Sequence, residues 1–278
     1  MFKKVFFIVF LVASMFSIHA HGDLDKRISV ISEEIKKTPD SALLYYKRSQ
    51  LYYQHNEFKK SIDDLKKSDR LGFDNNEQYF LYARNYFKLN KFNLSLKHVR
   101  KFLKIQPNHL KGLQLVGKIY FAKSEFEKSA RAFEKVIANS RKTLPENYIE
   151  ASEAWYALRT ETGIQKSKQM LIKGIMDLGD NIVIYQTLIS NAIDQEEYIF
   201  AIEYQKKVIE FSPRKERAYL KLSEIHLFDK NYLEAELSLN NAKKHYLKLP
   251  LRIKNSKFMR EFYSELEHID KRLKNTNY

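Results

Sequence analysis

Residues 76–109 read NEQYFLYARNYFKLNKFNLSLKHVRKFLKIQPNH, and residues 110–143 read LKGLQLVGKIYFAKSEFEKSARAFEKVIANSRKT. The two stretches align without a gap and share two aromatic positions and one serine position: Tyr86 and Tyr120, Phe92 and Phe126, Ser95 and Ser129. Agreement of this kind at a fixed spacing indicates that the chain repeats a structural unit.

The same spacing extends outward in both directions. Upstream, Tyr52, Phe58 and Ser61 lie 34 residues before their counterparts. Downstream, a second phase runs through Ile164, Tyr198, Tyr232 and through Ser167, Ala201, Ala235. A period of 34 residues is typical of a helix–turn–helix repeat. The expected units are 42–75, 76–109, 110–143, 148–181, 182–215 and 216–249.

On these residues the chain resembles the tetratricopeptide-repeat (TPR) family. The second unit carries the family's pattern of large, small, aromatic and terminal proline positions at Tyr79, Ala83, Tyr86, Phe92, Ser95 and Pro107. The resemblance implies an all-α fold. We expect a right-handed superhelical solenoid of about six helix-turn-helix units, with capping helices at the N- and C-terminal ends.

The expected segments follow from this alignment: 1–20 signal peptide, 21–40 N-terminal helix, 41–143 units one to three, 144–181 a degenerate fourth unit, 182–249 units five and six, 250–278 C-terminal capping helix. The fourth unit departs from the pattern because Trp155 occupies the position that is small elsewhere. The C-terminal segment is amphipathic, and we expect it to bury Phe258, Phe262, Leu266, Ile269 and Leu273.

The first twenty residues predict export. Lys3 and Lys4 precede the apolar run VFFIVFLVASMF, and the small residue Ala20 suits a cleavage site. The apolar run is shorter than the about 20 residues that span a bilayer, so the mature chain is expected to have no membrane span. Export without any cysteine favours the periplasm of a Gram-negative bacterium, or secretion.

Composition excludes several kinds of chemistry. The absence of cysteine rules out disulfides, thiolate metal sites and a cysteine nucleophile. The formal charge of +15 favours acidic partners, yet no run of five like charges marks a nucleic-acid tail. No phosphate-binding loop, nucleophile elbow or zinc-protease motif occurs, so we expect no enzyme activity and no cofactor.

The remaining titratable and glycine positions are expected to be structural. We expect Asp63, Asp64, Glu196 and Glu197 on solvated surfaces or turns, His55 and His98 on or near exposed parts of helices, and His226 in the core. Gly72, Gly163 and Gly179 are predicted in turns, and Gly117 and Gly174 at close helix contacts. His21 is the exception, because cleavage after Ala20 would give it a free amine beside its imidazole, and these nitrogens can chelate copper.

The resemblance also implies a working surface, since the first helices of TPR units line a concave groove. The positions expected to face it are Tyr46, Gln50, Tyr53, Phe80, Arg84, Phe87, Lys111, Gln114, Lys118 and Phe121, and in later units Gln186, Ser190, Ile193, Arg217, Leu220, Glu224 and Leu227. Basic residues alternate there with aromatic ones. Such a surface suits an extended protein segment with acidic and apolar groups. An alternative is that the aromatic residues simply pack between helices.

These expectations lead to one main hypothesis and two competitors. The main hypothesis is a non-catalytic protein–protein interaction scaffold or adaptor in the bacterial cell envelope, without a small-molecule substrate. The first competitor is an accessory protein that handles copper through His21. The second is a helical repeat that binds nucleic acid, which export disfavours and a salt-dependent shift would revive.

Overall fold

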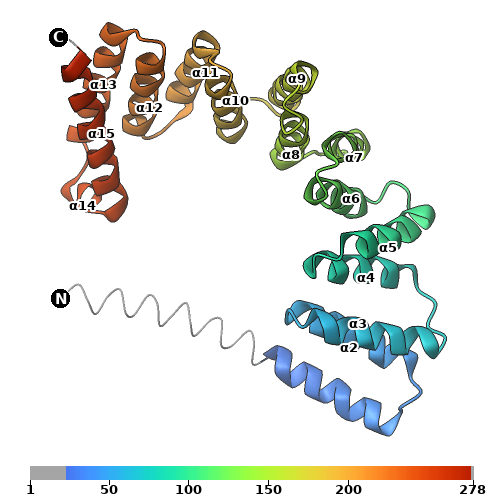
Figure 1. Ribbon diagram of the computed structural model, residues 1–278. Helices are drawn as coiled ribbons and strands as arrows, with labels where there is room; N and C mark the ends of the chain where they lie inside the picture. Colours follow the sequence, from blue (N-terminus) through green and yellow to red (C-terminus); the bar gives the residue numbers. More distant parts are fainter. Residues whose placement is uncertain (1–22, 277–278) are drawn as a thin grey trace. The chain divides into compact units, whose positions relative to one another are not determined.

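The computed structural model describes residues 23–276 and contains, over that range, helices and no strand (Figure 1). A helix over residues 23–37 is followed by α2 (Ala42–Gln54), α3 (Phe58–Arg70), α4 (Asn76–Lys88), α5 (Phe92–Ile105), α6 (Leu110–Ala122), α7 (Phe126–Asn139), α8 (Pro145–Tyr156), α9 (Glu161–Leu178), α10 (Ile182–Asp194), α11 (Tyr198–Phe211), α12 (Lys215–Phe228), α13 (Tyr232–Leu247), α14 (Leu251–Lys254) and α15 (Lys257–Thr276). The predicted all-α fold of helix pairs with a further helix at each end is confirmed. The predicted signal peptide and His21 lie outside the described residues.

The helices α2 to α13 form six pairs, numbered here one to six, each made of a first and a second helix. Two compact bodies contain them: an N-terminal body ending at Ser140 and a C-terminal body beginning at Arg141. Within a body, the second helix of one pair contacts the first helix of the next, as α3 does α4 and α11 does α12. Each pair therefore buries its apolar faces against its neighbours in sequence.

Small residues hold the two helices of each N-terminal pair together. Ser95 Oγ donates a 2.7 Å hydrogen bond to the carbonyl of Ala83, and Ser129 Oγ donates one of 2.9 Å to that of Gly117. Both serines are fully buried. A Cβ at Gly117 would lie 2.7 Å from the ring of Phe133, so this close approach requires glycine. The expected packing role of Gly117 is thereby explained.

The turn inside each pair has a backbone feature that the sequence did not suggest. One residue per turn has a positive φ angle: Asn56, Asn90, Ser124, Arg159, Glu196 and Lys230. In the second pair, the Asn90 amide donates to the Phe87 carbonyl at 2.9 Å and the Lys91 amide to the Tyr86 carbonyl at 2.8 Å. This pattern satisfies carbonyls left open at a helix end. Residues as different as asparagine, glutamate and lysine adopt it, so no residue type marks it.

The fourth pair is packed differently. Trp155 is buried within α8, and Gly163 lies inside α9 and not in a turn as expected. A Cβ at Gly163 would lie 2.6 Å from the carbonyl oxygen of Trp155. The hydroxyls of Ser152 and Ser167 are 2.7 Å apart and fully enclosed. The two helices therefore approach closely at Ser152 and Ser167 and again at Gly163, and the Trp155 side chain is not at the contact with Ser167.

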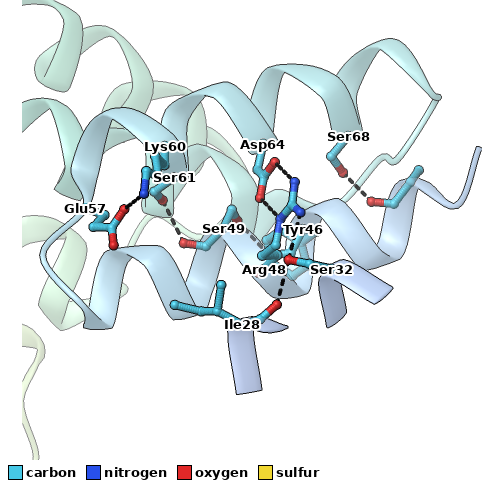
Figure 2. Close-up of polar contacts among 11 residues, drawn as sticks. Ile28, Ser32, Tyr46, Arg48, Ser49, Glu57, Lys60, Ser61, Asp64 and Ser68 are labelled. Carbon is cyan, nitrogen blue, oxygen red and sulfur yellow. Dashed lines mark hydrogen bonds and ion pairs between the residues drawn. The ribbon is translucent and has the colours of Figure 1, made fainter. Parts of the chain in front are cut away.

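A buried ion pair joins the helix over residues 23–37 to the first pair (Figure 2). The Arg48 guanidinium donates to both carboxylate oxygens of Asp64, at 2.7 and 2.8 Å, and to Ser32 Oγ at 3.0 Å. Asp64 is buried, which corrects the expectation that it lies on a solvated face. Hydrogen bonding to Asp64 raises the pKa of Arg48. Removing Arg48 would leave the Asp64 carboxylate buried without its partner, so this carboxylate is structural.

The C-terminal helix α15 covers the last pair. Its buried side chains are Met259, Phe262, Leu266, Ile269 and Leu273, which join the core formed by α12 and α13. Phe258 was expected in this stripe, but it is 49% exposed and lies one position away from it. Its ring centroid is 3.9 Å from the guanidinium carbon of Arg217.

Candidate functional site

The first helices of the N-terminal body carry a ladder of three aromatic residues, Tyr53, Phe87 and Phe121. Each ring contacts the aromatic residue that begins the following helix, with centroid separations of 5.7 Å to Phe58, 5.8 Å to Phe92 and 5.3 Å to Phe126. Tyr53 and Phe87 are half-buried, whereas Phe121 is 40% exposed. The ladder thus contributes to packing and still presents apolar surface.

Arg84 ties this ladder together between two pairs. Its guanidinium carbon lies 4.1 Å from the ring centroid of Tyr53 on α2 and 5.7 Å from that of Phe80 on its own helix. The side chain is half-buried. A cation over an aromatic face is attracted by the ring quadrupole, by about 0.5–2 kcal/mol depending on burial. Arg84 is therefore held flat against the aromatic surface.

Two of the predicted groove residues belong more to the core. Tyr46 is buried and stacks on Phe73 with centroids 4.9 Å apart. Burial is the main reason that the pKa of Tyr46 is raised. Phe80 stacks on Phe102 at 4.9 Å and meets the edge of His109 at 5.4 Å. Tyr46 consequently offers almost no surface to a partner, and Phe80 offers only part of its ring.

The other predicted groove positions are more open. Gln50, Lys111 and Lys118 are exposed, and Gln114 is half-buried. With Arg84 and the aromatic ladder they form what we call the basic–aromatic stripe: Gln50, Tyr53, Arg84, Phe87, Lys111, Gln114, Lys118 and Phe121. No carboxylate is among these side chains.

The first helices of the C-terminal body line two hollows. One, of about 390 Å³, includes Gln186, Ser190 and Ile193 of α10 together with Arg217. The other, of about 510 Å³, lies between α12 and α15 and includes Leu220 and Glu224 with Arg217. Six of the seven later groove positions thus line a concavity. The seventh, Leu227, is buried in the core.

Charge distinguishes these hollows from the stripe. Lys221 pairs with Glu224 at 2.6 Å, and Arg217 lies 4.0 Å from Glu265 on α15. Lys221, like Arg217, lines both hollows. The hollow between α12 and α15 therefore contains charges of both signs, whereas the charged residues that line the other hollow are all basic.

The histidines are placed for packing. His98 was expected on an exposed part of its helix, but it is half-buried and stacks on Tyr82 with centroids 4.6 Å apart. Burial, with smaller effects from Lys101 and Lys97, lowers the pKa of His98 to about 4. His226 is in the core as expected, and burial lowers its pKa too. His55 lies 3.0 Å from Glu57.

No group of three histidine, aspartate or glutamate side chains within residues 23–276 is arranged to hold a metal ion. Over the same range, no helix combines the length and apolar character needed to cross a membrane.

Comparison with known proteins identifies the repeat. A sequence profile of the tetratricopeptide repeat matches residues 78–109, which span most of α4 and all of α5. Residues 78–109 form a tetratricopeptide repeat, and the chain as a whole has the fold of tetratricopeptide-repeat structures. The profile covers one TPR unit, and the neighbouring pairs of the N-terminal body repeat the contacts of that unit. No curated protein matches the chain in sequence.

Solved TPR structures share the fold. The C-terminal part of a TPR repeat-containing protein from Cytophaga hutchinsonii has a TM-score of 0.68 at 14% identity, covering 86% of this chain and 94% of that one. A TPR protein from Parabacteroides merdae has a TM-score of 0.55 at 14% identity, covering 88% and 93%. MamA from Desulfovibrio magneticus, from its residue 41 to the end, has a TM-score of 0.53 at 19% identity, covering 64% and 96%. At such identities the likeness extends to the fold alone.

Proposed function

We propose that this TPR chain is a non-catalytic scaffold or adaptor that binds a protein partner through the first-helix faces of its repeats. TPR arrays in general act as interaction scaffolds. The observation that carries the proposal is the basic–aromatic stripe, in which Arg84 lies on Tyr53 at 4.1 Å and Phe121 stays 40% exposed. Large amphipathic side chains next to a held guanidinium are typical of residues that contribute most to binding.

The chemistry of the stripe favours a partner segment with acidic and apolar groups. Arg84 and Lys118 each precede a ladder aromatic, Phe87 and Phe121, by three residues. Side chains three apart lie next to each other on a helix. One carboxylate and one apolar side chain of a ligand could therefore contact adjacent parts of the stripe.

The C-terminal concavities add a second character to this partner. They combine Ile193 and Leu220 with the ion pair of Lys221 and Glu224. The charges of both signs in the hollow between α12 and α15 suit a segment that carries both signs, and electrostatic complementarity of this kind fixes orientation more than affinity.

A site-specific crosslinking experiment tests the proposal. A photo-crosslinking amino acid replaces Gln50 or Lys111 in the stripe, or Lys59 on α3 as the control. We expect one partner to crosslink in the native host from the stripe positions and not from position 59. Arg84→Ala with Lys118→Ala should lower that yield about tenfold, since each charged contact contributes on the order of 1 kcal/mol. The charge-matched pair Lys206→Ala and Lys207→Ala on α11 should leave it unchanged, and equal loss from both pairs would overturn the proposal.

We also propose that the scaffold works in the cell envelope. The support is the basic, apolar and small-residue order of positions 1–20. The intact mass of the protein from its native host should correspond to a chain that begins at His21. A retained Met1 with the protein in the cytosol would contradict this location. If the chain does begin at His21, a copper titration of that form against its His21→Ala variant tests the alternative of a metal-handling protein.

A further inference from the structure

The second helix of pair two differs in charge from the other second helices. α5 carries Lys97, Arg100, Lys101 and Lys104 and no acidic residue. The other five second helices of the described chain each carry at least two acidic residues: Asp63, Asp64 and Asp69 in α3, Glu127 and Glu134 in α7, Glu161 and Asp177 in α9, Glu203 and Glu210 in α11, Glu234 and Glu236 in α13. Charge has therefore accumulated on one repeat.

These four basic residues line a hollow of about 570 Å³, which also includes Tyr120 of α6 and Lys128 of α7. The one carboxylate in the hollow is Glu125. It pairs with Lys123 at 2.7 Å and Lys128 at 2.6 Å, and hydrogen bonds from these lysines lower its pKa to about 2. The negative charge of Glu125 is thus paired with lysines that lie outside α5.

None of the four basic groups of α5 forms an ion pair with a carboxylate among the described residues. Arg100 donates a 2.7 Å hydrogen bond to the hydroxyl of Tyr120. Lys101 Nζ lies 5.3 Å from the ring centroid of Tyr79. Neither contact neutralises a positive charge. Four like charges on one helix face destabilise the free protein, and an anionic ligand would relieve that repulsion.

We propose that this basic hollow is a second docking surface, which binds an acidic segment of a protein partner. Lys97, Lys101 and Lys104 follow one another along α5 at steps of about one turn, or about 5 Å, which suits a row of separate carboxylates. Lysine ammonium groups are point charges on flexible stems and accept irregular carboxylate spacing. The volume of the hollow exceeds what one phosphate group needs.

Other polyanions fit less well. Binding of single-stranded nucleic acid uses aromatic rings on which bases stack, and Tyr120 is occupied by Arg100 on its hydroxyl and by Lys128 at 5.6 Å from its ring centroid. Anionic membranes favour surfaces that combine basic groups with several exposed aromatic groups, whereas Tyr120 is the one aromatic residue that lines this hollow. The hollow shares no residue with the basic–aromatic stripe, so this inference stands even if the stripe binds nothing.

The test uses a fluorescein-labelled oligo-glutamate peptide and the full protein, with fluorescence anisotropy as readout. The variant is Lys97→Gln with Lys101→Gln and Lys104→Gln. The control removes the same charge from exposed lysines of three other second helices, through Lys59→Gln, Lys135→Gln and Lys206→Gln. We expect the α5 variant to bind about tenfold more weakly, and the control to change binding less than about twofold.

Replacing the three α5 lysines by arginine keeps the charge and should keep the affinity, which separates loss of charge from loss of folding. Equal weakening by the control variant, or no binding of the peptide, would overturn the proposal. Phosphatidylglycerol vesicles and a single-stranded DNA oligonucleotide are the competing ligands. Tighter binding of either one, with a stronger dependence on the α5 lysines than the peptide shows, would assign the surface to lipid or nucleic acid and overturn the acidic-segment proposal.

Discussion

The fourth pair differs from the second and third pairs in how its two helices pack against each other. In the second and third pairs, a fully buried serine of the second helix donates to a carbonyl beside a small residue of the first, Ala83 or Gly117. In the fourth pair the buried Ser167 of α9 meets Ser152 of α8, three residues before Trp155, and a further close approach occurs at Gly163. Each pair therefore has a close contact between its first and second helix, but the position of that contact along the helices differs from pair to pair.

The turns show the same contrast. In the third pair, the Glu125 amide donates a 2.9 Å hydrogen bond to the Tyr120 carbonyl, five residues earlier, and this bond closes the turn. In the fourth pair, the Arg159 amide donates a 3.0 Å hydrogen bond to the Tyr156 carbonyl, only three residues earlier. The helix α9 then begins at Glu161. A bulky residue in the small position is thus accommodated by a changed turn and an early glycine.

The strongest test of this comparison is Trp155→Ala, which places a small residue 12 positions before Ser167, the spacing that the second and third pairs have. Trp155 is 3% exposed, and removing a buried tryptophan leaves a cavity. We expect the free energy of unfolding to fall by about 3–5 kcal/mol. Urea denaturation followed by circular dichroism measures it. Phe211→Ala, at a site that is 47% exposed, is the control and should cost much less. A loss below about 1 kcal/mol would show that the fourth pair does not depend on the tryptophan.

Gly163→Ala tests the new contact point. The added Cβ would lie 2.6 Å from the Trp155 carbonyl oxygen, which is backbone and cannot rotate away. Overpacking of this kind costs about 1–3 kcal/mol, seen as a lower urea midpoint. Gly72→Ala is the matched change in open space, and its cost of about 1 kcal/mol comes from the positive φ of 83°. If Gly163→Ala costs less than Gly72→Ala, the helices of the fourth pair do not meet there.

The sequence predicted those parts of the fold that recur with a fixed period. Ser61, Ser95 and Ser129 were expected at close contacts, and all three are fully buried. Gly163 was misplaced because a glycine near a repeat junction reads equally well as a turn residue. Asp64 was misplaced because a carboxylate next to Asp63 resembles a solvated pair, and Arg48 lies on another helix. Long-range partners of this kind have no local signature.

The stripe could be predicted in outline but not in detail. The 34-residue ladder correctly brings Tyr53, Phe87 and Phe121 to equivalent positions. It could not tell that Tyr46 is buried under Phe73, because that depends on a loop residue between pairs. The basic residues of α5 can be read from the sequence. That Glu125 pairs with Lys123 and Lys128 and not with α5 is known only from the distances between these side chains.

Lowering the pH should destabilise the second pair through the half-buried His98 of α5. His98 has a pKa of about 4, below the ordinary 6.5, mainly because burial disfavours its charged form. As the pH falls, the unfolded chain therefore takes up this proton first. The free energy of unfolding is therefore unaffected by the protonation of His98 above about pH 6.5. It falls by on the order of 2 kcal/mol as the pH drops toward about 4. Urea midpoints at about pH 7 and about pH 4.5 should differ less in His98→Phe than in the natural protein. An identical difference in both would mean that His98 titrates like an exposed histidine.

The smallest expected effect concerns the serine contact itself. Ser95→Ala removes the 2.7 Å hydrogen bond to the Ala83 carbonyl, but that oxygen retains the helical bond from the amide four residues later. The helices can keep their separation, because alanine is smaller than serine. We therefore expect a loss of only about 1 kcal/mol in the free energy of unfolding. The fifth pair supports a modest value, since Ala201 is fully buried at the equivalent position without any hydroxyl. Ser95→Val keeps the site apolar but adds volume between the helices and should cost clearly more than Ser95→Ala. If the alanine variant proves the less stable of the two, the hydrogen bond, and not the small size of the residue, holds the regular pairs together.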